Sequence, residues 1–594
     1  MAVPLLSERD IDFLLYELLD TQALTQRPRY AEHDREVFAG ALATARAIAT
    51  DCFAPHYQKA DAHEPTFDGE RVHLLEETRQ AWDAFAQAGF LAAHHDAEDG
   101  GLQLPEVVLR ACMAYFNAAN VATTAYSFLT IGAANLIKSF ASDELRERFL
   151  PAMLDGRCSG TMALTEPGQG SALGDLRSSA RVAADGSFRL FGQKMFISGG
   201  DHDLTENIVH MVLARIEGAP AGVKGISLFL VPKWLGEQRN DVALAGLLHK
   251  MGHRNTTSTV LSFGERDGAI GYLVGEANQG LNYMFQMMNE ARIGVALAAA
   301  SLGYQSFNHA LAYARERPQG RLPGNKDPLQ PQVRIIEHAD VRRMLLQQKV
   351  YAEGSLALCL YASSLAEDAH TAPSSPQRHA AAELLDLLTP MVKSWPSRYA
   401  TQASDLGIQV LGGAGYTREY PLEQLYRDNR LNPIHEGTEG IQAIDLLGRK
   451  LGPRGGDGYR LFIERVRADL LRAAANGRCI SLAKQLDVAL STLEEVTHSL
   501  QLQVAKDAGA GLSNASAYLD LFGRVLVGWL WLRMAMIAGQ ALEDGTHGSD
   551  ADFYQGKLQA ARYFMDWELA GLAGTARLLL DGNRVSLDMH DAWY

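Results

Sequence analysis

The stretch SFRLFGQKMFISGGDHDLTENIVHMVLARI (187–216) decides the class of fold. Both of its ends are rich in β-branched and aromatic residues, and the Gly199-Gly200 pair between them is a turn signal. Further short runs of the same kind stand at 177–184, 224–232 and 257–263. We therefore expect a β-rich insert, which we place at residues 161–280.

Helical patterns precede and follow this insert. From Ser7 to Met153 apolar residues recur at helical spacing, first in SERDIDFLLYELLD (7–20), where Ser7 is placed to cap a helix. The stretch NLIKSFASDELRERFLPAMLDG (135–156) predicts two short helices, with Ser142 as cap of the second. Long helical periodicity returns from residue 281. Tight helix packing is indicated there by closely spaced small residues at Ala296, Ala299, Ala300 and Gly303.

A Gly-rich break at 452–458 marks a boundary, and the chain beyond it is helical again. This last part contains the apolar run VLVGWLWLRMAMIAGQALED (525–544), which has the composition of a core or interface helix. Trp529 and Trp531 could instead touch a membrane, but buried packing is the preferred interpretation. The predicted class is mostly α with a β insert.

Composition narrows the classes of partner. A formal charge of −15 over 594 residues argues against a nucleic-acid partner, because phosphate contacts need a basic surface. We find no uninterrupted apolar stretch of the roughly 18 residues that a membrane span requires, and no signal-peptide pattern at the start. The five cysteines are scattered without a C-x-x-C pair, and the histidines show no ligand spacing. We expect a cytoplasmic protein without a metal site.

One candidate for chemistry is GTMALTEPGQGSALGDLR (160–177). Its glycines allow close backbone approach, and the hydroxyls of Thr165 and Ser171 could bond a polar ligand. It lacks the G-x-x-x-x-G-K-[ST] spacing of a phosphate loop. Taken alone, a plain loop that joins a helix to a strand is the preferred interpretation.

Two further stretches are ambiguous by themselves. Phe196 and Ser198 end a strand pattern and fit ordinary half-buried strand residues. The Gly412-Gly413 pair invites backbone contact with a ligand, but a helix C-terminus explains it equally well.

The stretch NPIHEGTEGIQAIDLLGRK (432–450) holds two glutamates, Glu436 and Glu439, around a Gly-Thr pair. Thr438 is placed to cap a helix whose inward face would be formed by Ile441, Ile444 and Leu447. That explanation covers the residues from Thr438 onward and leaves Glu436 unexplained. A carboxylate just ahead of a helix, beside a glycine, is either solvated or poised for catalysis.

Taken in order, these stretches resemble the acyl-CoA dehydrogenase family over roughly residues 35–450. The resemblance rests on six motifs: LTEPGQGSALGDLR (164–177), GQKMFISGG (192–200), HKMGHRNTTSTVLSF (249–263), GYLVGEANQGLNYMFQMMNEARIG (271–294), IQVLGGAGYTREYPLEQLYRDNR (408–430) and IHEGTEGIQ (434–442). The long first helix and the helical unit after Gly458 look like an enlarged bacterial subgroup.

The resemblance implies the domain organisation. It comprises an N-terminal helical extension at 1–35, an N-terminal helical domain at 36–160, a barrel-like β domain at 161–280, a helical bundle domain at 281–455 and a C-terminal helical domain at 456–594.

The resemblance also implies FAD-dependent α,β-dehydrogenation of a saturated fatty acyl-CoA to a trans-2-enoyl-CoA. Glu436 matches the family's base, and burial beside the flavin and the acyl chain would raise its pKa toward that of the activated substrate. Glu439 would lie in the first helical turn, where its charge favours the helix dipole. One branch of the family carries its base just before the arginine that matches Arg292. Ala291 holds that position here, and Glu290 is one residue out of register.

Other residue roles follow only from the resemblance. It implies flavin contacts at Leu164, Thr165, Phe196 and Ser198, with further cofactor contacts at Arg317, Gln409, Gly412, Gly413 and Thr438. On the substrate side it implies Ser171, Arg292 and Gly437. The backbone N–H of Glu436 would help to bind the thioester carbonyl oxygen. The sequence departs from the family pattern at His435 (commonly tyrosine), Ser198 (commonly threonine), Phe196 (commonly tryptophan) and in ERPQGR (316–321), which lacks a phenylalanine.

The resemblance implies an electron-transferring flavoprotein as electron acceptor and a homodimer as assembly. The alternatives that the sequence leaves open are an acyl-CoA oxidase that uses O2 and a dehydrogenase of a specialised short acyl-CoA such as a methylthio-propanoyl-CoA. A non-enzymatic flavin-fold protein kept for binding or assembly is a third.

Overall fold

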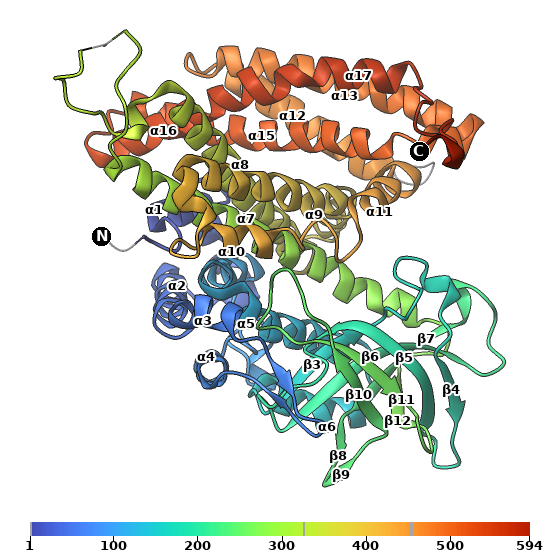
Figure 1. Cartoon of the computed structure of the whole chain (residues 1–594). Coiled ribbons are helices and arrows are strands. Elements are labelled where there is room, and N and C mark those ends of the chain that lie inside the picture. Colours follow the sequence, from blue (N-terminus) through green and yellow to red (C-terminus); the bar gives the residue numbers. More distant parts are fainter. Residues whose placement is uncertain (1–2, 325–326, 452–455) are drawn as a thin grey trace. The chain divides into compact units, whose positions relative to one another are not determined.

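The structure, a computed structural model, describes residues 3–324, 327–451 and 456–594 (Figure 1). The chain splits into two compact units. The helical unit comprises Met1–Asp34, Glu106–Ala111 and Val295–Tyr594, and the mixed unit comprises Arg35–Pro105 and Cys112–Gly294. The β-rich insert lies in the mixed unit.

The mixed unit combines helices with a sheet. Its helices are α2 (Arg35–Ile48), α3 (Tyr57–Ala62), α4 (Glu76–Gln87), α6 (Asp143–Leu154), most of α5 (Glu106–Phe140) and the first part of α7 (Gly280–Glu316). Its strands are β1 (Thr66–Phe67), β2 (Val72–His73), β3 (Cys158–Ala163), β4 (Ser179–Val182), β5 (Phe188–Ser198), β6 (Asn207–Ile216), β7 (Ile226–Pro232), β8 (Trp234–Leu235), β9 (Gln238–Arg239), β10 (Val242–Leu247), β11 (Ser258–Phe263) and β12 (Ala269–Val274).

Five strands of the mixed unit close into a ring, so the expected barrel-like form is confirmed. Strands β5, β12, β7 and β6 pair antiparallel in that order, and β4 joins β5 to β6. Strands β11 and β10 extend the sheet beyond β5, while β3 pairs parallel with β6.

Strands β6 and β7 are buried on both faces. Val212 and Phe229 belong to one apolar core with the other strands. Met211 and Leu228 belong to a second core, in which Phe149 of α6 also lies. Because side chains alternate along a strand, burial of both faces produces a continuous apolar run rather than an alternating pattern. This is how these two strands appear in the sequence.

The prediction of two short helices over 135–156 is wrong for the first of them. Residues 135–140 are the end of α5, a single long helix with a kink at Asn120 (φ −163°, ψ 88°). The Asn120 side chain accepts a hydrogen bond from Thr123 N (3.1 Å), which satisfies one backbone N–H at the kink. The predicted cap at Ser142 is confirmed, because its Oγ accepts from Leu145 N (3.4 Å) at the start of α6.

The helical unit contains the remaining elements. They are α1 (Glu8–Asp12), the rest of α7, α8 (Ala339–Thr371), α9 (Ser375–Leu411), α10 (Leu422–Asn429), α11 (Glu439–Ile444), α12 (Gly456–Ala474), α13 (Ile480–Lys506), α14 (Ala508–Leu512), α15 (Ala515–Glu543), α16 (Ser549–Tyr563) and α17 (Leu572–Leu580). Of the Gly-rich break predicted at 452–458, residues 452–455 lie outside the described part of the chain, and residues 456–458 begin α12.

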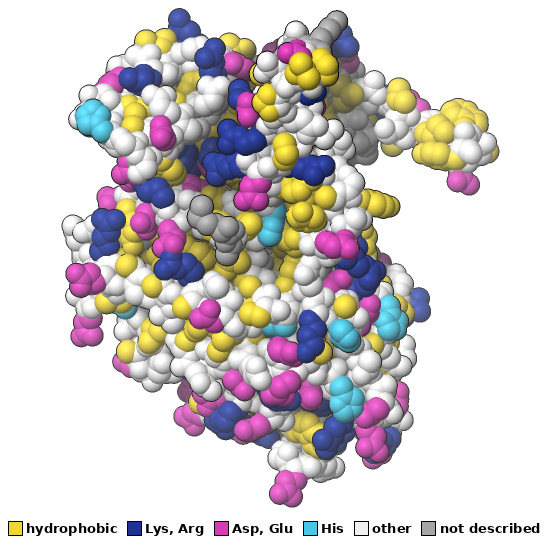
Figure 2. All heavy atoms as spheres, turned by 60° about the vertical axis from the view of Figure 1, so that its left-hand side comes forward, with side chains coloured by type: hydrophobic (Ala, Val, Ile, Leu, Met, Phe, Trp, Pro, Cys, Tyr) yellow, Lys and Arg dark blue, Asp and Glu magenta, His cyan; other side chains and the backbone are white. Residues whose placement is uncertain are grey.

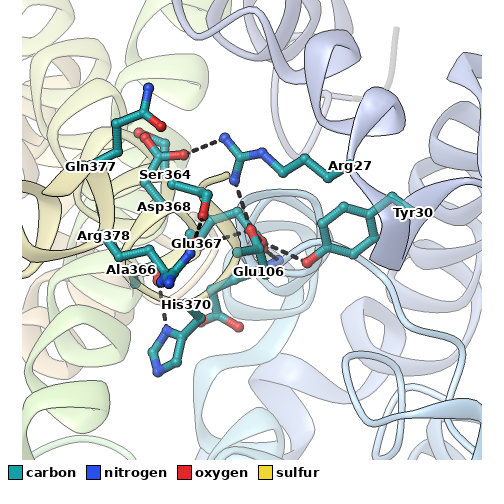
Figure 3. A network of polar contacts seen from close by, with 12 residues as sticks. Arg27, Tyr30, Glu106, Ser364, Ala366, Glu367, Asp368, His370, Gln377 and Arg378 are labelled. Carbon is teal, nitrogen blue, oxygen red and sulfur yellow. Dashed lines mark hydrogen bonds and ion pairs between the residues drawn. The ribbon is translucent and has the colours of Figure 1, made fainter. Parts of the chain in front are cut away.

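The N-terminal segment is anchored within the helical unit. The Ser7 Oγ accepts from Asp10 N (3.2 Å), which confirms the predicted cap of α1, and a π-helical segment (Phe13–Leu18) continues that helix. Farther along, the Tyr30 hydroxyl donates to Glu367 Oε1 of α8 (2.6 Å). Figure 3 shows this bond within a network of polar contacts, in which Arg27 also donates to Asp368 (2.5 Å).

The central helices of this unit pack closely. A Cβ at Gly303 of α7 would lie 2.7 Å from the Cβ of Ala400 of α9, so the tight packing expected from the small residues is confirmed. The apolar run of α15 is a core helix. Trp529 and Trp531 are buried, and their indole N–H groups donate to Asp469 (2.7 Å) and to Val350 O (3.3 Å).

Two helical stretches among the described residues are long and apolar enough to cross a membrane by length and composition alone, Arg35–Ala62 and Ala515–Glu543. The second of these is α15, and most of its apolar window is buried inside the protein. This is the usual state of a core helix in a soluble protein, so the composition of α15 needs no membrane to explain it.

Both signs of charge occur on the face of the molecule shown in Figure 2. Lys and Arg side chains are interspersed there with Asp and Glu side chains.

Candidate functional site

The residues predicted to contact a flavin gather at the end of β5 in the mixed unit. The carbonyl of Thr165 accepts a hydrogen bond from Met195 N (2.8 Å), which brings Leu164 and Thr165 beside that strand. Phe196 adopts the left-handed conformation (φ +60°), and its ring is 62% exposed. Ser198 is the last residue of β5 and is also exposed. An open aromatic face and a nearby hydroxyl are suitable contacts for a planar ring with polar edges.

A buried ion pair holds this region together. Lys194 is fully buried, and its Nζ lies 2.9 Å from Glu166 Oε1 and 3.0 Å from the carbonyl oxygen of Leu164. The Glu166 carboxylate also accepts from the N–H groups of Arg177 (2.7 Å) and Ser178 (3.0 Å). The pair therefore ties the two ends of the 164–178 loop to β5.

Both members of the pair are charged at neutral pH. Burial lowers the pKa of the Lys194 ammonium to about 8, and Glu166 opposes this shift. Burial alone would raise the pKa of Glu166, but Lys194 and the bonds from Ser178 and Arg177 bring it below its ordinary value.

Two of the three residues predicted on the substrate side, Ser171 and Arg292, lie on different elements of the mixed unit, and the third, Gly437, lies in the helical unit. Ser171 is exposed in the loop after the bridge between Glu166 and Gln169. Arg292 is buried on α7, where its Nη1 donates to Asn289 Oδ1 (3.4 Å) one turn earlier.

On α7, the position where one branch of the family carries its base is Ala291, and the neighbouring Glu290 is hydrogen-bonded to other residues. Ala291 is buried and cannot accept a proton. The Glu290 carboxylate accepts from Asn135 Nδ2 of α5 (2.8 Å) and from Gln286 Nε2 (3.3 Å). These bonds hold the Glu290 carboxylate against α5.

In the helical unit, Glu436 lies in a strained turn directly ahead of α11. It is half-buried and adopts the left-handed conformation (φ +54°), and Gly437 follows with φ +86°. For a residue other than glycine this conformation costs about 1–3 kcal/mol, and it persists only where neighbouring groups enforce it. Such strain gathers at functional sites, so the outlier supports a role for Glu436.

Two buried side chains hold this turn. Lys393 Nζ of α9 donates to the carbonyl oxygen of Gly437 (2.8 Å), and Gln442 Nε2 of α11 donates to the carbonyl oxygen of Glu436 (2.9 Å). Lys393 and Gln442 are both fully buried.

The helix after the turn differs from the prediction. Thr438 occupies the N-cap position, but its side chain makes no capping bond and is exposed. The predicted inward face is wrong for Ile441 and Ile444, which are 36% and 48% exposed, and correct for Leu447. The buried positions of this segment are Gln442, Ala443, Leu446 and Leu447.

The physical reason for this difference is the contact that orients α11. The hydrogen bond from Gln442 Nε2 to the Glu436 carbonyl turns Gln442 inward, and Ile444, two positions later on the helix, faces away from that side. The chain becomes π-helical only after these positions, from Asp445 to Lys450.

Glu439 points toward another part of the helical unit. It is the first residue of α11 and lines a small pocket with Ser394 and Arg398 of α9 and Asp520 of α15. The two glutamates therefore differ in surroundings, because Glu436 lies in the strained turn and Glu439 lies against α9 and α15.

His435 is fixed by a chain of amides. Asn432 Nδ2 donates to Asn429 Oδ1 (3.0 Å), so Asn432 Oδ1 is the acceptor for His435 Nε2 (3.2 Å). A neutral His435 ring would therefore donate this hydrogen bond from Nε2.

The residues predicted to contact the ADP half lie at the ends of two helices of the helical unit. Gly412 ends α9 with φ +62°, and its N–H bonds to the carbonyl of Gln409. Apart from the chain neighbours of each glycine, no described residue lies within 4 Å of a Cβ built at Gly412 or Gly413, so a ligand could approach this backbone. Arg317 follows α7, and its carbonyl accepts from Ile335 N (2.8 Å). Arg317 and Gln409 are exposed.

Four residues that hold these segments in place were not predicted from the sequence. They are Glu166 and Lys194 in the mixed unit, and Lys393 and Gln442 in the helical unit. A lysine inside an apolar segment was the available signal, since Lys393 stands in LLTPMVKSWP (387–396). Burial of an ammonium is costly unless it binds an acceptor, so such a lysine points to a specific contact.

The described residues contain no group of three or more His, Cys, Asp or Glu side chains that could hold a metal ion. All five cysteines are free thiols.

Comparison with known proteins agrees with this arrangement. Family models match in chain order at residues 40–157 (acyl-CoA dehydrogenase, N-terminal domain), 161–265 (middle domain), 278–451 (C-terminal domain) and 462–590 (acetyl-CoA dehydrogenase C-terminal like). The last match covers the helical part after the Gly-rich break.

Curated relatives match over nearly the whole chain. The 3-methylmercaptopropionyl-CoA dehydrogenase of Ruegeria pomeroyi is 36% identical and covers 94% of each chain. The broad-specificity linear acyl-CoA dehydrogenase FadE5 of Mycobacterium tuberculosis is 34% identical and covers 98% of each chain. The fold resembles that of an acyl-CoA dehydrogenase from Bacillus anthracis solved with FAD. The TM-score is 0.76 at 19% identity over 98% of this chain and 93% of that one.

These matches exclude a role confined to binding or assembly. In the mixed unit, the exposed Phe196 and the Ser198 hydroxyl suit a flavin ring, and FAD is the cofactor on which the family depends. The chain therefore belongs to the acyl-CoA dehydrogenase family and is an FAD-dependent oxidoreductase that acts on acyl-CoA thioesters.

Proposed function

We propose that this enzyme dehydrogenates saturated straight-chain fatty acyl-CoAs to trans-2-enoyl-CoAs, with Glu436 as the base that removes the α-proton. The observation that carries this proposal is the turn at Glu436. Glu436 is held there in a left-handed backbone conformation, and the backbone carbonyls of Glu436 and Gly437 accept hydrogen bonds from buried side chains.

The reaction breaks two C–H bonds. The α-proton next to the thioester carbonyl goes to the Glu436 carboxylate, and the β-carbon loses a hydride. Bound FAD supplies the hydride acceptor at its N5 atom. A fixed carboxylate helps because proton abstraction requires hydrogen-bond reach and correct orientation before the pKa match has any effect.

The other residues bind and orient. The Glu436 N–H would donate to the thioester oxygen, where negative charge develops as the α-proton leaves. Thr165, Phe196 and Ser198 would position the flavin. Glu439 would have no part in the reaction, because it lies against α9 and α15.

The substrate class is supported by relatives that differ in preference. FadE5 is described as acting broadly on linear acyl-CoAs, which favours straight chains. The methylmercaptopropionyl-CoA enzyme favours a second candidate substrate, a short acyl group that contains sulfur. Both carry a saturated bond between the α- and β-carbons, so the same base would serve either.

We further propose that an electron-transferring flavoprotein reoxidises the enzyme, that it works as a homodimer, and that it is cytoplasmic. Similarity to dehydrogenases over nearly the full length supports the acceptor. The exposed backbone at Gly412 and Gly413 supports a role for a second subunit in binding the ADP half. Five free thiols fit a reducing compartment.

Anaerobic titration of the purified yellow protein tests the proposal. Straight-chain acyl-CoAs from four to sixteen carbons, isobutyryl-CoA and 3-methylmercaptopropionyl-CoA are added in turn, and loss of the oxidised-flavin absorbance is recorded. We expect bleaching by straight chains and formation of the 2-enoyl-CoA. An oxidase would instead consume O2 and release H2O2 with each turnover. Retained yellow colour with every substrate would refute the proposal.

A further inference from the structure

Two buried side chains donate hydrogen bonds to consecutive backbone carbonyls of the turn that carries Glu436. Gln442 fixes the carbonyl of Glu436, and Lys393 fixes that of Gly437. One donor comes from α11, the helix that the turn begins, and the other from α9, far away in sequence.

These two bonds restrict where the Glu436 side chain can point. The direction of a Cα–Cβ bond depends on the peptide planes before and after that residue. Gln442 holds the plane after Glu436, and Lys393 holds the following plane, so both planes that meet at Gly437 are held. The turn therefore keeps the geometry in which Glu436 has a left-handed conformation (φ +54°).

Lys393 is a charged residue at a buried position. Its ammonium is fully buried on α9, and its sequence neighbours Val392 and Ser394 are also buried. Desolvation penalises a buried ammonium, and a neutral donor would satisfy a carbonyl at lower cost. A charged donor makes a stronger hydrogen bond, which is what a strained backbone turn requires.

The helix that carries Lys393 is itself clamped by the C-terminal part of the chain. The ring of Trp395 packs against Gly523 of α15, where an added Cβ would lie 2.8 Å from Trp395 Cδ1. One turn later, Tyr399 donates to Asp520 of α15 (2.6 Å). The C-terminal helices therefore fix the position of the residue that holds the Gly437 carbonyl.

We infer that Lys393, together with Gln442, is a positioning residue that aims the Glu436 carboxylate at the α-carbon of the substrate. This inference rests on the proposed role of Glu436 as base. Lys393 contacts neither substrate nor flavin in this scheme and acts only through the turn.

The test measures proton abstraction by itself. An acyl-CoA with sulfur in place of the β-carbon has acidic α-protons but no β-hydrogen to leave as hydride. In D2O its α-protons exchange at a rate set by the base. We expect Lys393→Met to slow this exchange at least about 100-fold, since a displacement of about 1 Å costs that much. The FAD content and the dissociation constant of the analogue should stay at wild-type values.

Two further variants give the comparison. Gln442→Met removes the neutral donor and should slow exchange at least about 10-fold, again with unchanged binding. Ser397→Ala is the control on α9, because its buried hydroxyl donates to the Lys393 backbone carbonyl of its own helix (2.6 Å) and not to the turn. It should exchange like the wild type.

The outcomes separate this inference from the proposed function. Wild-type exchange in Lys393→Met, with exchange abolished in Glu436→Gln, would overturn the positioning role and leave the base assignment intact. Wild-type exchange in Glu436→Gln would refute the base assignment and the inference with it. If Lys393→Met does not fold, Gln442→Met decides, and wild-type exchange there overturns the inference. Loss of FAD or of analogue binding in proportion to the rate would also overturn it, because it would indicate general structural damage.

Discussion

Lys194 Nζ lies 2.9 Å from Glu166 Oε1, and neither side chain is more than 5% exposed. The pair joins the loop after β3 to β5, the strand that carries Phe196 and Ser198. Removal of one partner leaves the other charge buried without compensation, which costs about 3–5 kcal/mol. We therefore expect Lys194→Met to lower the free energy of unfolding by that amount and to release FAD, as measured by chemical denaturation and by the ratio of flavin to protein absorbance.

The exposed pair of Arg181 and Glu217 serves as its control. It lies on the same sheet, but both side chains are more than half exposed. Arg181→Met should change stability by less than about 1 kcal/mol and leave the flavin ratio at its wild-type value. Equal losses in the two variants would show that burial of the Lys194 pair has no special importance.

Two buried histidines of the mixed unit predict a loss of stability in mild acid. Burial lowers the pKa of His202 and of His210 to about 3, and the charge of Lys233 acts in the same direction. In the unfolded chain both imidazoles have a pKa near 6.5. Between pH 6.5 and 3 the unfolded chain therefore binds more protons than the folded protein. Their stabilisation is complete above pH 6.5 and falls as the pH decreases. At pH 5.5 the two histidines together should lower the free energy of unfolding by about 3 kcal/mol relative to pH 7.5, as measured by denaturation at both pH values.

Hydrogen bonds explain why His202 stays neutral. Its Nδ1 accepts from Leu204 N (3.2 Å), so the proton sits on Nε2, which faces Ser159 Oγ (3.0 Å). Replacement of His210 by Asn removes one titrating ring. The fall in the free energy of unfolding between pH 7.5 and 5.5 should therefore be smaller by about 1.4 kcal/mol. The exposed His63→Asn should leave it unchanged. An undiminished loss in His210→Asn would contradict this account.

A buried charge cluster predicts that the N-terminal segment depends on the C-terminal helices. Lys557 of α16 bonds to Asp10 of α1 and to Glu353 of α8 (2.8 Å to the latter), and all three are almost fully buried. Lys557→Met would leave Asp10 buried without this cation, while Glu353 keeps its ion pair with Lys349, so we expect the free energy of unfolding to fall by about 3–5 kcal/mol. Hydrogen exchange of the α1 amides should become faster in the same variant.

An exposed pair in the same part of the chain gives the comparison. Arg584 and Asp588 are both about half exposed, and Arg584→Met should cost less than about 1 kcal/mol. Unaltered α1 exchange in Lys557→Met would show that the segment is held by its apolar side chains alone.

Much of the fold was predictable because local patterns agree with tertiary packing. The apolar run around Trp529 predicted a buried helix, and the alternation of β5 predicted a strand with one face in a core. The length of α5 was not predictable. Asn120 interrupts its geometry without ending it, because the Asn120 side chain satisfies the N–H of Thr123 that the kink exposes.

The candidate site was less predictable, because its geometry depends on contacts between distant residues. The inward face of α11 was assigned from the spacing of its apolar residues, which fails because the hydrogen bond from Gln442 to the Glu436 carbonyl turns Gln442 inward instead. The turn that contains the strained Glu436 is held by Lys393, 43 positions earlier, and no local pattern in the sequence predicts that hydrogen bond. The sequence did separate Glu436 from Glu439, because the start of a helix is a local signal.

The central claim is that Glu436, and not Glu439, removes the α-proton. The most direct measurement is stopped-flow reduction of the bound flavin by a straight-chain acyl-CoA without oxygen, in Glu436→Gln and Glu439→Gln. We predict that Glu436→Gln keeps FAD bound and slows reduction by about 10²–10⁴-fold. Glu439→Gln should change the rate less than about threefold, since its charge affects only the start of a helix. Equal losses in the two variants, or rapid reduction in Glu436→Gln, would contradict the account.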